Sequence, residues 1–439
     1  MFVPSCKVLA AGVTAATLSL SAHAAVEIQW WHAMGGELGE ILEGITEDFN
    51  TSQDDYRVRP SYRGNYTETM TGAIAAFRAG EQPHILQVFE VGTGTMMAAE
   101  GAVYPIHELM EAHGRAFDRE AFLPAVVGYY TDTRGNMLSF PFNSSTPILY
   151  INRDAFDAAG IQDTPETWEE VVEASRQLRE SEAASCGFTT SWPSWVMLEN
   201  FSAMHDSPLG TLENGFGGLD TEFVFDNELV ARHWDNLKAW QDEGVFRWGG
   251  PGPGDDAAPM FYSGECAMFF GSSAARVGVL ANSDFDVDYA MQPYYADVES
   301  APQNSIIGGA TLWALQGHSD EEYEAVAAFF EYLSQPEVQA EWHQRTGYLP
   351  ITQAAWELSK EQGFYAENPG TDISIEQMTL NPPTENSKGL RFGNFVQIRD
   401  IISEEMEAVM SGQKSGEQAG ADAARRGNAL LRDFESANR

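Results

Sequence analysis

The first part of the chain alternates between apolar runs and amphipathic stretches. The runs VEIQWWH (26–32) and YRVRPSY (56–62) predict two strands, and the segment between them has apolar residues at helical spacing. NYTETMTGAIAAFRAG (65–80) predicts a second helix that ends at Gly80, and HILQVFEV (84–91) predicts a buried parallel strand. This order of elements predicts an open α/β sheet.

The pattern begins again after FPFNSSTPILYINRDAF (140–156), where a strand leads into a new set of helices. Small residues at 144–147 and 306–310 mark two crossings between the sets, which predicts two lobes joined by a hinge. The predicted lobes combine ranges distant in the sequence: 25–144 with 306–352 in lobe 1, and 145–305 with 353–439 in lobe 2. The predicted fold class is therefore α/β with two lobes.

Residues 1–24 have the pattern of a secretory signal. One Lys precedes the 13-residue, mostly apolar run VLAAGVTAATLSL, and AHA provides a cleavage site after Ala24. No other apolar run approaches the roughly 18 residues that span a bilayer. We therefore expect an exported, soluble protein.

The charge balance is strongly acidic, with 65 Asp and Glu against 25 Lys and Arg and a net charge of −40. Such a surface repels nucleic acid and anionic membranes. Adaptation to a saline habitat is the simpler interpretation, and an acidic face for a partner is the alternative. An anionic ligand would need a local site in either case.

Two cysteines, Cys186 and Cys266, remain after the signal segment. An oxidising compartment permits a disulfide between them, but the expectation we favour is two buried free thiols. No metal-binding spacing surrounds either cysteine.

Motifs for catalysis are missing from the sequence. GTGTMM (92–97) lacks the third glycine of a dinucleotide fingerprint, and SGQK (411–414) has no accompanying K-T-G or S-D-N triplet. The sequence predicts no enzyme, no cofactor and no metal.

Arg399 lies in SKGLRFGNFVQIRDII (387–402), where helical spacing gives it the same face as Phe395 and Ile402. A guanidinium that points inward is costly unless it meets an anion. The sequence therefore predicts an anion at this position.

Other polar and aromatic residues stand at predicted strand ends, loops or crossings, where open α/β sheets bind ligands. The alternatives are a solvated strand end for Glu90, helix caps for the serines and packing for Tyr348. The residues are Tyr66, Glu90, Ser145, Trp192, Trp195, Ser272, Gly309 and Tyr348.

The chain resembles the family of periplasmic sn-glycerol-3-phosphate-binding proteins of ABC importers, within the maltose-type solute-binding proteins. The resemblance covers essentially the whole predicted mature chain and is carried by segments such as WWHAMGGELG, SYRGNY, PFNSSTPILY, WPSWVMLENFSA, QNSIIGGATLWALQG and KGLRFGNFVQIR. It implies a type II, maltose-binding-protein-like fold with a central ligand cleft, a periplasmic monomer, and permease subunits as partners.

The resemblance also implies a ligand shell. Its members are the tyrosines of RGNY and TGYLP (Tyr66, Tyr348), the glutamate of QVFEVG (Glu90), the tryptophans of WPSW (Trp192, Trp195), the second serine of FNSSTP (Ser145), the serine after CAMFFG (Ser272), the second glycine of IIGG (Gly309) and the arginine of NFVQIR (Arg399). Arg399 would hold the phosphate, and Glu90 would accept hydrogen bonds from glycerol hydroxyls at the opposite end.

One segment departs from the family. Phe269 and Phe270 replace small hydroxyl residues before the serine pair. With Tyr66, Trp192 and Trp195 they are candidate aromatic faces for a choline group, and packing in the core is the alternative for the two phenylalanines. We therefore expect glycerophosphocholine to bind at least as well as glycerol-3-phosphate. Two alternative functions remain: a binding protein for a neutral oligosaccharide, and a secreted hydrolase of glycerophosphodiesters.

Overall fold

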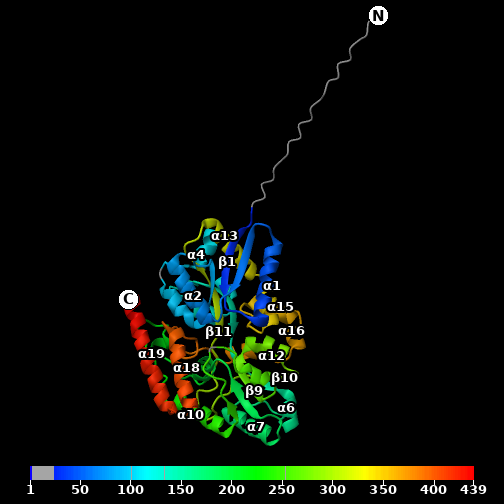
Figure 1. The fold of residues 1–439 in the computed structure, drawn as a ribbon, viewed down its shortest axis with the longest axis vertical. Helices are drawn as coiled ribbons and strands as arrows, with labels where there is room; N and C mark the ends of the chain where they lie inside the picture. Colours follow the sequence, from blue (N-terminus) through cyan, green and yellow to red (C-terminus); the bar gives the residue numbers. More distant parts are fainter. Residues whose placement is uncertain (2–23, 100, 133, 253) are drawn as a thin grey trace.

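The computed structural model describes residues 1, 24–99, 101–132, 134–252 and 254–439. The predicted signal segment and its cleavage lie outside the described residues, apart from its two end positions. The described chain forms two lobes stacked along the long axis of the molecule (Figure 1). We define lobe 1 by the sheet that contains β1, and lobe 2 by the sheet that contains β9.

Lobe 1 is built on a six-stranded sheet. Its order is β2 (Tyr56–Tyr62), β1 (Val26–His32), β3 (Ile85–Phe89), β11 (Gly308–Leu315) and β4 (Val103–Tyr104), with β5 (Phe140–Ser145) also paired to β11. β1 is parallel to both β2 and β3, whereas β11 is antiparallel to β3, β4 and β5. The three strands predicted at the start of the chain are therefore confirmed as β1, β2 and β3.

Helices cover lobe 1 because each has one apolar face. α1 (Gly36–Ser52) buries Leu42, Ile45 and Phe49, and α13 (Asp320–Leu333) packs against β1. α2 (Tyr66–Ala79) begins after a capping box at Asn65 and is closed by Gly80, whose φ of 72° ends the last turn, as predicted. The other helices of this lobe are α3 (Thr93–Ala98), α4 (Ile106–Ala112), α5 (Pro124–Tyr130), α14 (Pro336–Thr346) and α15 (Gln353–Glu361).

Lobe 2 is built on a five-stranded sheet. Its order is β10 (Val287–Ala290), β6 (Pro147–Asn152), β9 (Cys266–Ser272), β7 (Cys186–Thr190) and β8 (Phe246–Arg247). Its longer helices include α7 (Trp168–Glu180), α10 (Glu228–Glu243), α18 (Phe395–Met410) and α19 (Gly416–Asn438). The shorter ones are α6 (Arg153–Ala159), α8 (Phe201–Met204), α9 (Thr211–Asn214), α11 (Ala258–Tyr262), α12 (Arg276–Asn282) and α17 (Ile373–Met378), whereas α16 (Phe364–Glu367) packs on α15 of lobe 1.

The longest helix, α19, packs on α18 and α10 along the side of lobe 2 (Figure 1). It carries charged residues on its outer face, as an amphipathic surface helix does. No helix among the described residues has both the length and the apolarity needed to cross a membrane.

The chain crosses between the sheets at two adjacent places. Thr146 alone separates β5 from β6, and the segment 291–307 leads from β10 back to β11. The Thr146 hydroxyl donates a hydrogen bond of 2.6 Å to the hydroxyl of Ser305, so the two crossings are tied together. The Gln377 side chain donates to both Thr146 and the Pro147 carbonyl. The lobe boundaries within the sequence stay a prediction.

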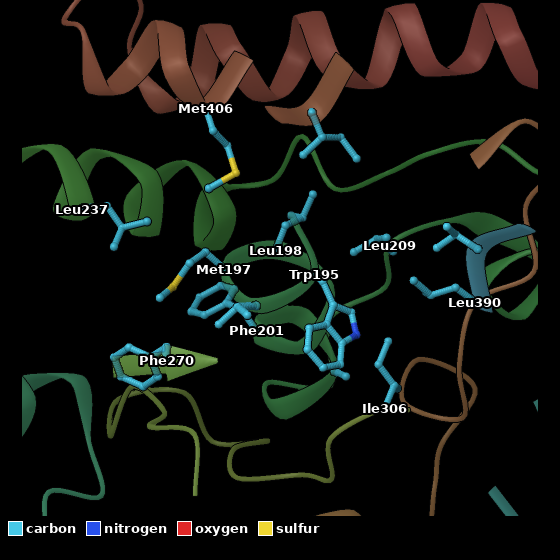
Figure 2. Close-up of a cluster of buried hydrophobic side chains, with 14 of the residues drawn as sticks. Trp195, Met197, Leu198, Phe201, Leu209, Leu237, Phe270, Ile306, Leu390 and Met406 are labelled. Atoms are coloured by element: carbon cyan, nitrogen blue, oxygen red, sulfur yellow. The ribbon is translucent and has the colours of Figure 1, made fainter. Parts of the chain in front are cut away.

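Phe269 and Phe270 belong to the core of lobe 2, and the expectation that they face a ligand is wrong. Both side chains are fully buried. Phe270 packs against Trp168 and Phe188 on one face of the sheet, and Phe269 packs against Tyr150 on the other. Successive residues of a strand point to opposite faces, so both faces here are covered. Figure 2 shows Phe270 among the apolar side chains that also surround Trp195 and Phe201.

Cys186 and Cys266 form a disulfide, which corrects the expectation of two free thiols. They lie directly opposite each other in the parallel pair β7 and β9, with their Cα atoms 4.4 Å apart. The sequence places them 80 residues apart and gives no strand register, so it could not show this proximity.

Candidate functional site

A cavity of about 230 Å³ lies between the two lobes. All nine residues predicted for the ligand shell line it: Tyr66, Glu90, Ser145, Trp192, Trp195, Ser272, Gly309, Tyr348 and Arg399. The remaining lining residues were not predicted; they are Ala33, Met34, Gly35, Leu38, Phe89, Asp255, Ala274 and Ala275. The structure therefore brings together residues that are separated by more than 300 positions in the sequence.

Arg399 points inward from α18, as its spacing predicted, and it meets two protein carboxylates. Its Nη2 donates to Glu90 Oε1 and to Glu199 Oε2, each at 2.6 Å, and its Nε donates to Glu199 Oε1 at 2.8 Å. Glu90 comes from the 3-10 turn Glu90–Gly92 (η1) of lobe 1, whereas Glu199 belongs to lobe 2. We call these three residues the charge trio.

The charge trio corrects two expectations. Glu90 is in contact with Arg399 and does not stand at the opposite end of the site. The anion that meets the inward guanidinium in the structure is carboxylate, mainly that of Glu199. Arg399 Nη1 makes no hydrogen bond to a described residue, so one side of its fork remains available to a ligand.

The charge trio carries an excess of negative charge. Burial opposes the charge of Arg399, but Glu199 and Glu90 outweigh that effect and raise its pKa, so the guanidinium stays protonated. Burial raises the pKa of Glu90, and Arg399 opposes that rise. When both carboxylates are ionised, they outnumber the single guanidinium by one charge.

Glu199 lies in a π-helical segment, Trp195–Asn200, that leads into α8. Its side chain is 1% exposed, and Ser194 Oγ donates to its Oε1 at 2.9 Å. Sequence reasoning missed this residue because it stands within the apolar run WVMLENF, whose spacing reads as core. Wide turns of this kind occur frequently at functional sites.

Tyr66 opens α2 and is held by a chain of side-chain hydrogen bonds. Gln87 accepts from the Ala33 backbone and donates to Asn143 Oδ1, and Asn143 donates to the Tyr66 hydroxyl at 3.0 Å. The ring of Tyr66 stacks on Phe89, with centroids 5.1 Å apart. This arrangement fixes an aromatic wall of the cavity in lobe 1.

Trp192 has a strained backbone and a defined side-chain partner. Its φ of 50° lies in the left-handed region, which bulky residues rarely adopt outside functional sites. Its indole Nε1 donates to Asp255 Oδ1 at 3.1 Å. Desolvation raises the pKa of Asp255 to about 6, against the hydrogen bond from Trp192. The Asp255 side chain is nevertheless exposed to solvent, so we expect it to be ionised at pH 7.

Trp195 joins the cavity to the core of lobe 2. Its side chain is buried, and its ring covers Gly308, where an added Cβ would lie 2.4 Å from the indole Cζ2. Figure 2 shows the indole within the apolar cluster, with Ile306 labelled next to it. Its Nε1 is buried and has no hydrogen-bond partner among the described residues.

Some hydroxyl-bearing residues of the cavity already have a contact within the protein, and others do not. Ser272 accepts from the Ala274 amide and caps the turn Ser273–Ala275 (η4), so the cap alternative holds for it. The Ser145 hydroxyl forms no hydrogen bond with a described residue. Tyr348 stacks on Trp342, which supports the packing alternative, but it also lines the cavity. Burial raises the pKa of Tyr348 to about 12, so it stays a neutral donor.

Gly309 is required by the contact between strands. Its φ is 95°, and an added Cβ would lie 1.9 Å from the Asn143 carbonyl oxygen of β5. Any side chain would therefore separate β11 from β5 at the floor of the cavity. This contact explains the glycine without a ligand.

One group of potential metal ligands occurs in the described residues, and it lies outside the cavity. His84, His318 and Glu322 have ligand atoms within 4.8 Å of one another. The Gln29 amide donates to His84 Nδ1, which leaves the proton on Nε2, 3.2 Å from Glu322. Glu322 also caps α13 through Ser319. Hydrogen bonds therefore account for this group.

Known proteins resemble this chain both in sequence and in fold. The model of the bacterial extracellular solute-binding protein family matches residues 44–370. The sn-glycerol-3-phosphate-binding periplasmic protein UgpB of Yersinia pseudotuberculosis is 45% identical over 426 residues, 96% of each chain. UgpB from Mycobacterium tuberculosis in complex with glycerophosphocholine matches with a TM-score of 0.78 at 19% identity, covering 93% of this chain and 99% of that one. Maltose-bound MalE3 of T. maritima matches with a TM-score of 0.75 at 20% identity, covering 92% and 100%.

These similarities bear on three predictions. The two-lobe, maltose-type fold is confirmed by the structural matches. A binding function in place of catalysis, and a location in the periplasm, are confirmed by the family and the relative from Yersinia. The chain belongs to the bacterial extracellular solute-binding protein family, and among its members it groups with the periplasmic UgpB proteins.

Proposed function

We propose that this protein captures glycerol phosphate esters in the periplasm for an ABC importer. The ligands are sn-glycerol-3-phosphate and glycerophosphodiesters such as glycerophosphocholine, as the names of the similar proteins indicate. The observation that carries the proposal is the convergence of all nine predicted shell residues on one cavity between the lobes.

The polar groups of the cavity suit such an ester. The free side of the Arg399 fork provides a cationic donor for a phosphate oxygen, and the Ser145 hydroxyl provides a neutral donor. Glu90, next to Arg399, can accept a hydrogen bond from the glycerol hydroxyl on the carbon next to the one that carries the phosphate. The aromatic rings of Tyr66 and Trp192 would cover the carbon skeleton.

The size of the cavity favours a small solute. About 230 Å³ lies below the roughly 300–1,000 Å³ that is typical of pockets for drug-sized ligands. An oligosaccharide would need a longer groove, so the cavity argues against that alternative. The second alternative, a hydrolase, would need a metal cluster or an activated nucleophile. No such group lines the cavity among the described residues.

Binding and delivery follow from the two-lobe fold. The shell residues come from both lobes, so neither lobe alone offers the full set of contacts. A ligand that contacts both lobes stabilises the closed arrangement. We infer that permease subunits receive the ligand from this closed form.

A thermal-shift screen followed by calorimetry tests the proposal. The ligands are glycerol-3-phosphate, glycerophosphocholine, maltose and inorganic phosphate, each with the full-length mature protein. Ligand at 100 times its Kd stabilises the folded state by about 2.7 kcal/mol, which raises the melting temperature measurably. We expect a rise with at least one glycerol ester and none with maltose. A rise with maltose alone would contradict the proposal.

A further inference from the structure

One carboxylate of the cavity has no role in the function described so far. Asp255 lines the cavity, and its single side-chain partner among the described residues is the Trp192 indole. No Arg, Lys or His of the described chain forms an ion pair with it. A charged group in a ligand cavity without a protein counter-ion is available to a charge on the ligand.

Asp255 differs in this respect from the carboxylates of the charge trio. Glu90 and Glu199 are neutralised in part by Arg399. The charges that act on Asp255 come from Asp256, and those that act on Arg399 come from the two glutamates. Among the described residues Arg399 pairs with the two glutamates and not with Asp255, so the cavity offers one carboxylate without a cation and one cation with a free donor.

Trp192 holds this carboxylate in a defined orientation. The hydrogen bond from Trp192 occupies Oδ1 of Asp255 and leaves Oδ2 without a side-chain partner among the described residues. The left-handed backbone of Trp192 sets the direction in which the indole leaves the main chain. An indole face beside a carboxylate attracts a substituted ammonium group both by cation–π contact and by charge. Tyr262 lies close enough for Asp255 to raise the pKa of its hydroxyl, so a second aromatic residue is near.

Resting on the proposed function, we propose that Asp255 and Trp192 form a subsite for the cationic headgroup of a glycerophosphodiester. Choline and ethanolamine are headgroups of this class. The glycerophosphate part would lie toward the charge trio, and the headgroup would lie against Trp192 with its charge beside Asp255. This subsite makes the cavity selective for zwitterionic diesters over esters without a cation.

The balance of charge in the cavity supports this selectivity. Glu90 and Asp255 line the cavity and Glu199 is buried against Arg399, so three carboxylates stand in or beside the cavity against the single guanidinium of Arg399. A dianionic monoester adds two negative charges to this excess, whereas a zwitterionic diester adds none in total. Like charges in a partly desolvated site repel, so the zwitterion is favoured.

The decisive experiment compares Asp255→Asn with Asp256→Asn by calorimetry. Asp256 is the matched control because it is the next residue and also exposed, but it does not line the cavity. The ligands are glycerophosphocholine, glycerophosphoglycerol and glycerol-3-phosphate. Glycerophosphoglycerol keeps the phosphodiester charge and replaces the cation with a neutral group.

We expect Asp255→Asn to weaken glycerophosphocholine binding about tenfold, to leave glycerophosphoglycerol within twofold and to strengthen glycerol-3-phosphate slightly. Asp256→Asn should leave all three affinities within twofold. Equal losses for both diesters, or no loss for glycerophosphocholine, would overturn the subsite. Wild-type protein that binds none of the esters would overturn the proposed function itself, so the two failures are distinguishable.

Discussion

The two charged ends of the cavity differ in how far their carboxylates are buried and paired with a cation. At one end, Glu90 and Glu199 are 5% and 1% exposed and share the guanidinium of Arg399. At the other end, Asp255 is exposed and has one neutral donor, the Trp192 indole. At the first end the protein itself provides the counter-charge for the carboxylates. At the second end the counter-charge for Asp255 would come from the ligand.

This difference has an electrostatic consequence. Charges inside the protein interact strongly because little water screens them, whereas an exposed charge is screened by solvent and salt. The end with Arg399 should therefore decide whether an ester binds at all. The end with Asp255 should decide, by a smaller free energy, which ester binds best.

The largest effect should come from Arg399→Ala. Loss of the charged fork should weaken binding of every phosphate ester about 100-fold or more. It should also lower the free energy of unfolding by about 3–5 kcal/mol, because two buried carboxylates lose their partner. Calorimetry and urea unfolding measure the two quantities.

A second change separates those two effects of Arg399→Ala. Glu199→Gln in the Arg399→Ala background removes one unpaired charge, so it should restore part of the stability but none of the affinity. An Arg399→Ala variant with affinity within threefold of wild type would show that this end does not hold the ester.

A smaller effect should distinguish the two glutamates of the trio. Glu199 accepts two hydrogen bonds from Arg399 and one from Ser194, all within lobe 2, whereas Glu90 reaches Arg399 from lobe 1. Glu199→Gln should lower the free energy of unfolding by about 1–3 kcal/mol. Glu90→Gln should mainly lower ester affinity, by about tenfold for a lost charge-assisted hydrogen bond. Identical stability and affinity changes in the two variants would argue against this division.

The smallest effect should be a dependence of affinity on pH. The pKa of Asp255 is raised to about 6 by desolvation, so acidification from pH 8 to pH 5 removes its charge and its attraction for a cation. The pKa of Glu90 is also raised, and its protonation favours an anionic ligand. Glycerophosphocholine should therefore bind a few-fold more weakly to wild type at pH 5, as calorimetry can measure. In Asp255→Asn the dependence should vanish or reverse; an unchanged decrease would assign it to another group.

The sequence predicted the fold and the nine shell residues for different reasons. Periodicity alone indicated the two α/β sets and the inward face of Arg399, because burial repeats with the period of the element. The shell residues near strand ends were indicated by position, and the family resemblance selected them. The structure brings all nine to one cavity.

The partners of these residues could not be predicted in the same way. Glu199 is 200 positions from Arg399 and stands in an apolar run, so neither spacing nor composition singles it out. Asp255 lies in a loop rich in Gly, Pro and Asp that resembles any surface loop. The pairing of Cys186 with Cys266 depends on strand register. Periodicity reports which face is buried, and it does not report which buried groups meet.

The hydrogen bond between Thr146 and Ser305 has a mechanical consequence. The two crossings, joined at Thr146 and Ser305, can bend together, but the bond opposes sliding of one past the other. Relative sliding of the crossings would break a buried hydrogen bond, at a cost of about 0.5–1.5 kcal/mol, whereas joint bending leaves it intact. The bond between Thr146 and Ser305 therefore favours joint bending of the two crossings over sliding of one past the other.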